Sequence, residues 1–318
     1  MAVFTALTRD EIAALLDAYS VGQLVGFEGI PSGIENTNFF LDTTGGQFVL
    51  TVFERLTRTQ LPFYLGLMKH LAQRGLPVPE PAQTLQGALF SDARGKPAAV
   101  VSRLAGRAVD LPSTAQCAQV GQVLARMHLQ ARDFPLFQPN LRGIGWWKSA
   151  LPKLEPMIPE HLFQELAEEV IFQDSFVRSV SFERLPHGPI HGDLFRDNVL
   201  FAGNRVGGVI DFYFAACSLW LFDLAVTVND WCVDPASGEF DRARVTAMLT
   251  SYHEVRPLTD AEHGVWRTVL RAAALRFWIS RLYDLHLPRP AALLQPHDPA
   301  RFERMLRLRV RQADLPWV

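Results

Sequence analysis

The stretch that decides the fold is His191-Gly-Asp-Leu-Phe-Arg-Asp-Asn-Val-Leu-Phe201, followed after a short turn by Val209-Ile-Asp-Phe-Tyr213. Each part contains a short apolar run rich in Val, Leu, Ile and Phe, which is typical of a β-strand. Between the runs lies Ala202-Gly-Asn-Arg205, whose Gly-Asn pair is typical of a tight turn. The pattern therefore predicts a β-hairpin with polar side chains at its open end.

The hairpin predicts which polar side chains meet. If Phe201 faces Val206 across the turn, Asn198 faces Val209. Side chains two residues apart share one face of a strand, so Asn198 and Asp211 become diagonal neighbours. An amide oxygen beside a carboxylate forms a site that suits Mg²⁺, which prefers oxygen ligands.

A second carboxylate, Asp193, lies five residues before Asn198, on the loop that enters the hairpin. There it can face both the metal ion and the hydroxyl of a substrate, an arrangement that suits phosphoryl transfer from a nucleotide. The alternative is a polar hairpin whose Asp and Asn residues serve only the turns. The presence of His191 and of Asp211-Phe-Tyr at the matching position favours the chemical interpretation.

Composition limits the class of protein. The chain has 318 residues, 48% hydrophobic and 20% charged, with 22 Phe, 7 Trp and a net charge of −2, which excludes a disordered chain. An isoelectric point near 6.5 argues against a general nucleic-acid binder. The longest apolar run, 219–228, is interrupted by Asp223, so we expect no membrane span. Charged residues at positions 9–11 and three scattered cysteines predict a cytoplasmic protein without disulfides or a signal peptide.

The chain changes character near its first third. Up to about residue 102 we predict a β-rich lobe with strands at 24–30, 37–42, 47–53, 82–85 with 89–91, and 98–103, and helices at 8–18 and 61–74. After a hinge at 102–106, capping boxes and apolar periodicity predict helices beginning at Ser113, at 162–180, at 242–255 and at 259–285, with one β segment at 187–212. The predicted domains are residues 1–102 and residues 103–318.

The His-Gly-Asp-x-x-x-x-Asn motif followed by Ile-Asp-Phe resembles the aminoglycoside phosphotransferase and choline kinase superfamily, whose members are related to protein kinases. Within it the chain is most similar to the type II homoserine kinases. The segments that carry this resemblance begin at Gly29, Phe48, Gly75, His191 and Asp223. The resemblance implies an α+β, protein-kinase-like fold with a small antiparallel N-lobe that binds nucleotide and a larger helical C-lobe.

The resemblance also implies roles for the motif residues. Asp193 is expected to be the catalytic base, and Asn198 and Asp211 to hold Mg²⁺. His191 is expected to brace the catalytic loop, although a histidine that merely satisfies a turn is compatible with the same position. Asp223 is expected to support the loop through hydrogen bonds; the alternative is a charge that only favours a helix N-terminus.

The nucleotide side of the site is predicted from the segment 31–38, which joins the first two strands and is expected to cover the phosphates. A loop of this composition can also be a plain turn. Glycine permits close approach of the backbone, and polar side chains add contacts. The residues assigned to ATP, including two whose main chain is expected to bind adenine, are Ser32, Gly33, Asn36, Asn38, Thr51, Ser102 and Leu104.

One position departs from the protein-kinase pattern. Thr51 stands on the third strand where a kinase has the lysine that holds the α- and β-phosphates. The following helix, 61–74, has no acidic residue to pair with such a lysine. Arg55 or Lys69 could supply the missing charge, although solvent exposure is the commoner state of such residues.

The acceptor expected from the resemblance is L-homoserine, a zwitterion with a primary hydroxyl, and the product is O-phospho-L-homoserine for threonine synthesis. Its ammonium needs a carboxylate and its carboxylate needs an arginine. The candidates are Asp230 first, then Asn229, and Arg276 or Arg281 on the predicted long helix. Alternatives are phosphorylation of an aminoglycoside, choline or another amino alcohol, and a kinase-like protein that binds nucleotide without catalysis. The arginines between positions 301 and 311 are expected to form a solvated helix face; we expect neither nucleic acid nor membrane as partners.

Overall fold

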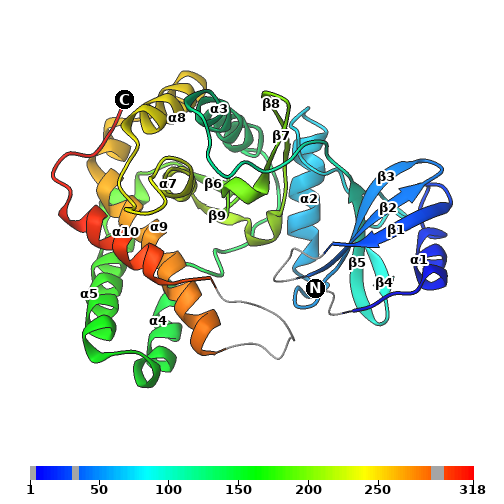
Figure 1. Cartoon of the computed structure of the whole chain (residues 1–318), viewed down its shortest axis with the longest axis horizontal. Coiled ribbons are helices and arrows are strands. Elements are labelled where there is room, and N and C mark those ends of the chain that lie inside the picture. Colours follow the sequence, from blue (N-terminus) through cyan, green and yellow to red (C-terminus); the bar gives the residue numbers. More distant parts are fainter. Residues whose placement is uncertain (1–4, 31–35, 288–296) are drawn as a thin grey trace. The chain divides into compact units, whose positions relative to one another are not determined.

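The computed structural model describes residues 5–30, 36–287 and 297–318, which form two compact units (Figure 1). One unit lies within residues 1–105 and the other comprises the described residues from 106 onward. None of the helices in these described ranges has the length and apolar character that crossing a membrane requires.

The first unit is built on a five-stranded antiparallel sheet with the strand order β1-β2-β3-β5-β4. Phe39, Leu41, Leu50 and Val52 alternate along β2 and β3, so their side chains share the face that packs against α1. This face is the core of the unit. Its elements are α1 (Arg9–Leu16), β1 (Leu24–Gly29), β2 (Thr37–Thr43), β3 (Gly46–Val52), α2 (Leu61–Ala72), β4 (Ser91–Ala93) and β5 (Lys96–Ser102).

The second unit is mainly helical, with two short β-ribbons that carry the motif. Its α-helices are α3 (Thr114–Gln130), α4 (Ile144–Leu154), α5 (Glu160–Val177), α6 (Val180–Glu183), α7 (Trp220–Trp231), α8 (Arg242–Val255), α9 (Asp260–His286) and α10 (Ala300–Arg311). Its strands pair as β6 (His187–Ile190) with β9 (Ala216–Leu219) and β7 (Val199–Ala202) with β8 (Arg205–Val209). Short 3₁₀ turns are η1 (Glu155–Met157), η2 (Arg196–Asn198) and η3 (Phe212–Phe214).

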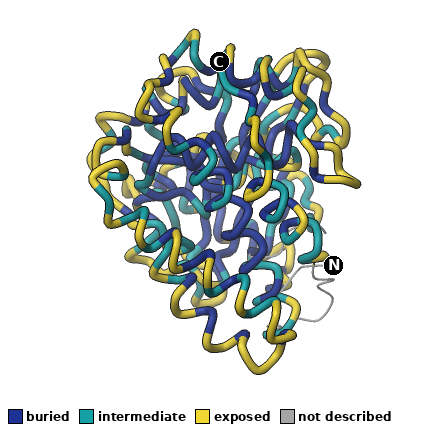
Figure 2. Tube along the Cα trace, turned by 90° about the vertical axis from the view of Figure 1, so that its left-hand side faces the viewer, coloured by how far each residue is buried: buried dark blue, intermediate teal, exposed yellow. Residues whose placement is uncertain are grey.

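Helix α7 is the central element of this unit, because every one of its residues is buried. Figure 2 shows that buried stretches of the chain lie in the interior and that exposed residues lie on the outer turns. Polar residues on such a helix must find partners inside the protein. Asp223, Asn229 and Asp230 all lie on α7, so their contacts define the interior of the unit.

The predicted helix starts are confirmed. Capping boxes form at Thr8, Ser113 and Thr259, where each side chain accepts the backbone N–H three residues later and that residue's side chain reaches back. The helix predicted at 242–255 has those bounds in the structure. These helix ends can be predicted from nearby residues because the capping side chain and the first apolar residues of the helix lie within a few positions of each other.

The strand predictions were wrong in three places. Within residues 82–85 only Thr84 forms an isolated bridge, and the strand after them is β4. The prediction of a single β segment ending at 212 missed β9. In the hairpin, Phe201 does face Val206, but a register shift after Leu200 places Val199, not Asn198, opposite Val209. The shift is a bulge, in which one strand carries an extra residue.

Candidate active site

The loop that carries Asp193 is held by Asp223, in the first turn of α7. The Asp223 carboxylate accepts the backbone N–H groups of His191 and Gly192, each at 2.7 Å. Gly192 has φ +75°, and a Cβ there would lie 2.8 Å from the carbonyl oxygen of Phe214. Glycine is required because both the left-handed conformation and the close approach exclude a larger residue. These contacts therefore fix the backbone conformation of the loop beside Asp223.

His191 joins the loop to the strand that precedes Asp211. Its Nε2–H donates to the carbonyl oxygen of Ile210 at 2.9 Å, and its Nδ1 accepts the backbone N–H of Asp193 at 3.2 Å. Burial lowers the pKa of the imidazole, so the ring is neutral and the two contacts define its tautomer. His191 thus accepts a backbone N–H of its own turn and also connects Asp193 to the segment that carries Asp211.

The amide of Asn198 is oriented by Asp193. Its Nδ2 donates to the backbone oxygen of Asp193 at 2.8 Å and lies 3.4 Å from the carboxylate Oδ2. The Ile210 N–H donates to the Asn198 carbonyl at 2.9 Å, so the bulged hairpin still brings the two motif segments together. Asp211 is exposed and adopts φ 64°, a left-handed conformation rare for a residue with a side chain.

The carboxyl group of Asp193 is electrostatically unusual. Burial raises its pKa from an ordinary value of 3.8 to about 8; Arg276 opposes the rise, and the nearby charges of Asp211, Asp197 and Asp230 add to it. The Arg276 guanidinium lies 3.3 Å from Asp193 Oδ1 and stacks on the ring of Phe277 at 3.7 Å. A carboxyl with a pKa close to neutrality is well matched to proton transfer.

Behind Asp223 lies a buried relay that the sequence analysis did not identify. Arg256 Nε donates to the Tyr252 hydroxyl at 3.0 Å, the hydroxyl donates to His128 Nδ1 at 2.7 Å, and His128 Nε2 donates to Asp223 Oδ2 at 3.1 Å. Glu262 forms a bidentate ion pair with Arg256. Only the capping box of Glu262 was visible in the sequence, because the other contacts join residues more than 90 positions apart or lie off any motif.

These contacts decide the charge state of Asp223. Burial alone raises its pKa, but the hydrogen bonds from His128 and from the Gly192 N–H hold the pKa below its usual value. His128 has a lowered pKa because it is buried. His128 therefore donates a hydrogen bond as a neutral ring to the Asp223 carboxylate, which stays ionised.

Two acceptor-binding predictions on α7 do not agree with the geometry. The Asp230 carboxylate already accepts the backbone N–H of Arg196 at 2.9 Å, its Nε at 3.0 Å and Arg301 Nη2 at 2.7 Å. Asn229 donates to the carbonyl of Leu270 at 2.9 Å and accepts Arg309 Nε at 3.1 Å. Both side chains have partners within the protein, which leaves little capacity for a substrate ammonium.

The predicted nucleotide residues are only partly described. Ser32 and Gly33 lie outside the described residues. The buried Thr51 hydroxyl donates to Asn38 Oδ1 at 2.7 Å across the sheet, on the face opposite the core. The backbone N–H of Glu80 donates to the Ser102 hydroxyl at 2.9 Å at the end of β5. Asn36 is buried just before β2, and Leu104 is half-buried beyond β5.

The expectation of a solvated arginine face on α10 was wrong for part of the helix. Arg309 is fully buried, with Phe240 stacked 3.5 Å from its guanidinium carbon, and Arg301 pairs with Asp230. Arg304 and Arg311 are exposed. The charge pattern alone did not reveal that helix α9 and the 238–240 segment cover one side of α10.

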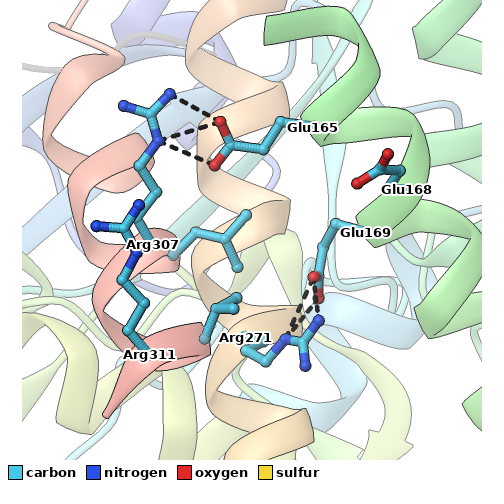
Figure 3. A pocket seen from close by; sticks show the side chains of 8 residues that line it. Glu165, Glu168, Glu169, Arg271, Arg307 and Arg311 are labelled. Atoms are coloured by element: carbon cyan, nitrogen blue, oxygen red, sulfur yellow. Dashed lines mark hydrogen bonds and ion pairs between the residues drawn. The ribbon is translucent and has the colours of Figure 1, made fainter. Parts of the chain in front are cut away.

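A hollow between α5, α9 and α10 lies apart from the motif (Figure 3). Its acidic and basic side chains neutralise one another, since Arg307 pairs with Glu165 at 2.7 Å and Arg271 with Glu169 at 2.5 Å. Leu306 and Val310 supply its apolar lining. No motif residue lines this hollow, and it carries none of the chemistry described above.

Comparison with known proteins agrees with this geometry. A model described as "Phosphotransferase enzyme family" matches residues 26–258. The chain belongs to the phosphotransferase enzyme family. It is 54% identical over 316 residues to the homoserine kinase of Janthinobacterium sp. (strain Marseille), covering 99% of this chain and 98% of that one. It is 53% identical to the homoserine kinase of Paraburkholderia xenovorans (strain LB400), covering 100% and 98% of the two chains.

Solved structures of this phosphotransferase fold are similar at much lower identity. An amicoumacin kinase in complex with AMP-PNP, Ca²⁺ and Ami has a TM-score of 0.73 at 15% identity, covering 95% of this chain and 93% of that one. The choline kinase of Cryptosporidium parvum Iowa II has a TM-score of 0.66 at 15% identity, with 94% and 95% covered. The protein-kinase-like α+β fold, with its antiparallel sheet and mainly helical second unit, is thereby confirmed.

Proposed function

We propose that this chain is an ATP-dependent kinase that transfers a phosphoryl group to the side-chain hydroxyl of L-homoserine and forms O-phospho-L-homoserine, an intermediate of threonine synthesis. The observation that carries this proposal is the full-length identity of 52–54% to eight homoserine kinases. The geometry supports the reaction class, because an ionisable carboxyl, an amide oxygen and a second carboxylate come from adjacent turns of one hairpin.

Asp193 is proposed to act as the base. It accepts the proton of the homoserine hydroxyl as the hydroxyl oxygen forms its bond to the γ-phosphorus of ATP. The bond between the γ-phosphorus and the oxygen that bridges to the β-phosphate breaks, and ADP leaves with that oxygen. A base whose pKa lies near the working pH combines a useful ionised fraction with good proton affinity. Arg276, 3.3 Å from Oδ1, orients the carboxylate and stabilises its ionised form.

Asn198 and Asp211 are proposed to hold Mg²⁺. The Asn198 amide nitrogen donates a hydrogen bond to the backbone oxygen of Asp193. The amide oxygen therefore points away from that backbone oxygen and is suited to a hard cation. Mg²⁺ usually takes one or two protein ligands and completes its shell with phosphate oxygens and water. Bound there, the ion supplies positive charge to the phosphate oxygens.

The other expected roles follow from the contacts. Asp223 and His191 are proposed as positioning residues, since they hold the loop and the Ile210 carbonyl while Asp193 reacts. Ser32, Gly33, Asn36, Asn38, Thr51, Ser102 and Leu104 remain the proposed nucleotide residues. Thr51 and Asn38 act as a hydrogen-bonded pair, which leaves the Asn38 amide N–H groups as neutral donors where a protein kinase has lysine.

The test is a coupled ADP-release assay with Mg²⁺ and ATP against L-homoserine, choline, an aminoglycoside and simple amino alcohols. We expect kcat/KM for L-homoserine to exceed that for the other acceptors by at least about 100-fold. The Asp193→Asn variant is expected to lose about 1,000-fold in kcat with both KM values little changed. ADP release that no acceptor stimulates, or a preference for another alcohol, would overturn the proposal.

A further inference from the structure

Two arginines outside the proposed catalytic set share one aromatic ring near the motif. The guanidinium carbon of Arg281, on α9, lies 4.5 Å from the centre of the Phe302 ring, and that of Arg301 lies 5.4 Å from it. Burial and the neighbouring charge of Arg301 lower the pKa of Arg281 to about 10. Two like charges held together in a half-buried place repel each other, and an anion between them would relieve that repulsion.

The donors of this pair are not fully used. Arg301 Nη2 donates to Asp230, but its Nε is buried and has no hydrogen-bond partner among the described residues. Arg281 Nη1 donates to the carbonyl oxygen of Asp298 at 2.9 Å, and this is the one side-chain hydrogen bond of Arg281 within the described ranges. A buried N–H group without a partner is uncommon in folded proteins and indicates a missing acceptor.

The local charges suit a ligand that carries both signs and no net charge. Arg196 and Arg301 both pair with the single carboxylate of Asp230. Asp197 is exposed and forms no ion pair within the described ranges. Three arginines, Arg196, Arg281 and Arg301, therefore meet three carboxylates, those of Asp230, Asp197 and Asp298, and the charges of the cluster balance. The cluster also contains Asp197 as an acidic group not held by an arginine, which matches the needs of a zwitterion.

Aromatic contacts connect this cluster to the loop of Asp193. Phe195, two residues after Asp193, packs against Phe277 with ring centres 4.4 Å apart, and Phe277 packs against Phe302 at 5.1 Å. Phe277 also lies under Arg276, the partner of Asp193. The two arginines are thus connected to the loop of the proposed base through the rings of Phe302, Phe277 and Phe195.

We propose that Arg281 and Arg301 bind the α-carboxylate of the acceptor amino acid and that Asp197 faces its ammonium, so that the hydroxyl is directed to Asp193. This inference rests on the proposed function and names the residues that make the enzyme specific for an α-amino acid. Asp230 then has a different role from the one predicted, since it positions Arg196 and Arg301 for this subsite. Simple alcohols and amines lack the carboxylate, so they bind more weakly because they make no contact with Arg281 and Arg301.

The test compares L-homoserine with 3-amino-1-propanol, which is homoserine without its carboxylate. In Arg281→Met, whose side chain still covers the Phe302 ring, we expect KM for L-homoserine to rise about 10- to 100-fold, the range for a lost charge-assisted hydrogen bond. KM for ATP should stay within about twofold. The inhibition constant of 3-amino-1-propanol, measured in competition with L-homoserine, should be the same as in the wild type because this molecule does not use the subsite.

Three controls make the result specific. Arg304→Met, an exposed arginine on the same helix as Arg301, should leave all constants unchanged. Arg281→Lys should restore part of the affinity, and thermal melting of each variant separates misfolding from lost binding. An unchanged KM for L-homoserine in a folded Arg281→Met, or an equal loss of affinity for 3-amino-1-propanol, would overturn the subsite. A wild-type enzyme inactive on L-homoserine would instead overturn the proposed function.

Discussion

The substitution Tyr252→Phe tests whether the relay behind Asp223 contributes to the fold, because it removes one hydroxyl and no other atom. That hydroxyl is fully buried, accepts a hydrogen bond from Arg256 Nε and donates one to His128 Nδ1. In the variant Arg256 Nε and His128 Nδ1 each lose the one hydrogen bond that they form among the described residues. Each orphaned buried group costs about 1–3 kcal/mol, and loss of the buried hydroxyl returns part of this. We expect a net loss of about 2–4 kcal/mol in the free energy of unfolding.

For a unit of about 200 residues this corresponds to a fall in Tm of about 5–15 °C. The assay is thermal melting followed by tryptophan fluorescence, since Trp220 stacks on His128 with ring centres 5.5 Å apart and reports this region. The matched control is Tyr283→Phe on α9, which contacts Trp146 through its ring and should melt within about 1 °C of the wild type. A Tm for Tyr252→Phe as close to the wild type as that control refutes the reasoning.

Three further predictions concern the loop and its charges. Asp223→Asn replaces one of the two oxygens that accept the backbone N–H groups of His191 and Gly192 by an NH₂ donor, so kcat should fall about 100-fold through displacement of Asp193, and an unchanged kcat in a steady-state assay would contradict this. Asp211→Asn keeps a residue type that tolerates the left-handed backbone, and the Mg²⁺ concentration for half-maximal activity should rise at least about 10-fold in a titration at fixed ATP. His128 and His191 are buried with lowered pKa values, so below pH 6.5 these two rings bind more protons in the unfolded chain than in the folded one, whereas Asp193, with its raised pKa, acts in the opposite sense. Each histidine should therefore lower the free energy of unfolding by up to about 1.4 kcal/mol per pH unit as the pH falls below 6.5. A chemical-denaturation series should show this as a difference, in which the stability of His128→Gln relative to the wild type rises as the pH falls, and the same pH dependence in both proteins would contradict it.

Local patterns predicted much of the secondary structure and the chemical class of the site. Capping boxes acted as expected because both of their partners lie within four residues. The motif placed Asp193, Asn198 and Asp211 on one hairpin, although a bulge after Leu200 moved the register by one residue. An error of one position did not separate the motif residues, because the Ile210 N–H still bonds to the Asn198 carbonyl.

The sequence by itself determined the reaction type, since the spacing of base and proposed metal ligands is a property of one continuous stretch. Only the tertiary structure decided which acids and bases are already paired. Asp230 meets Arg301 from 71 residues away, and His128 meets Asp223 from 95 residues away. The physical reason is that an ion pair or buried hydrogen bond depends on distance in space, whereas periodicity reports only which face of an element is covered.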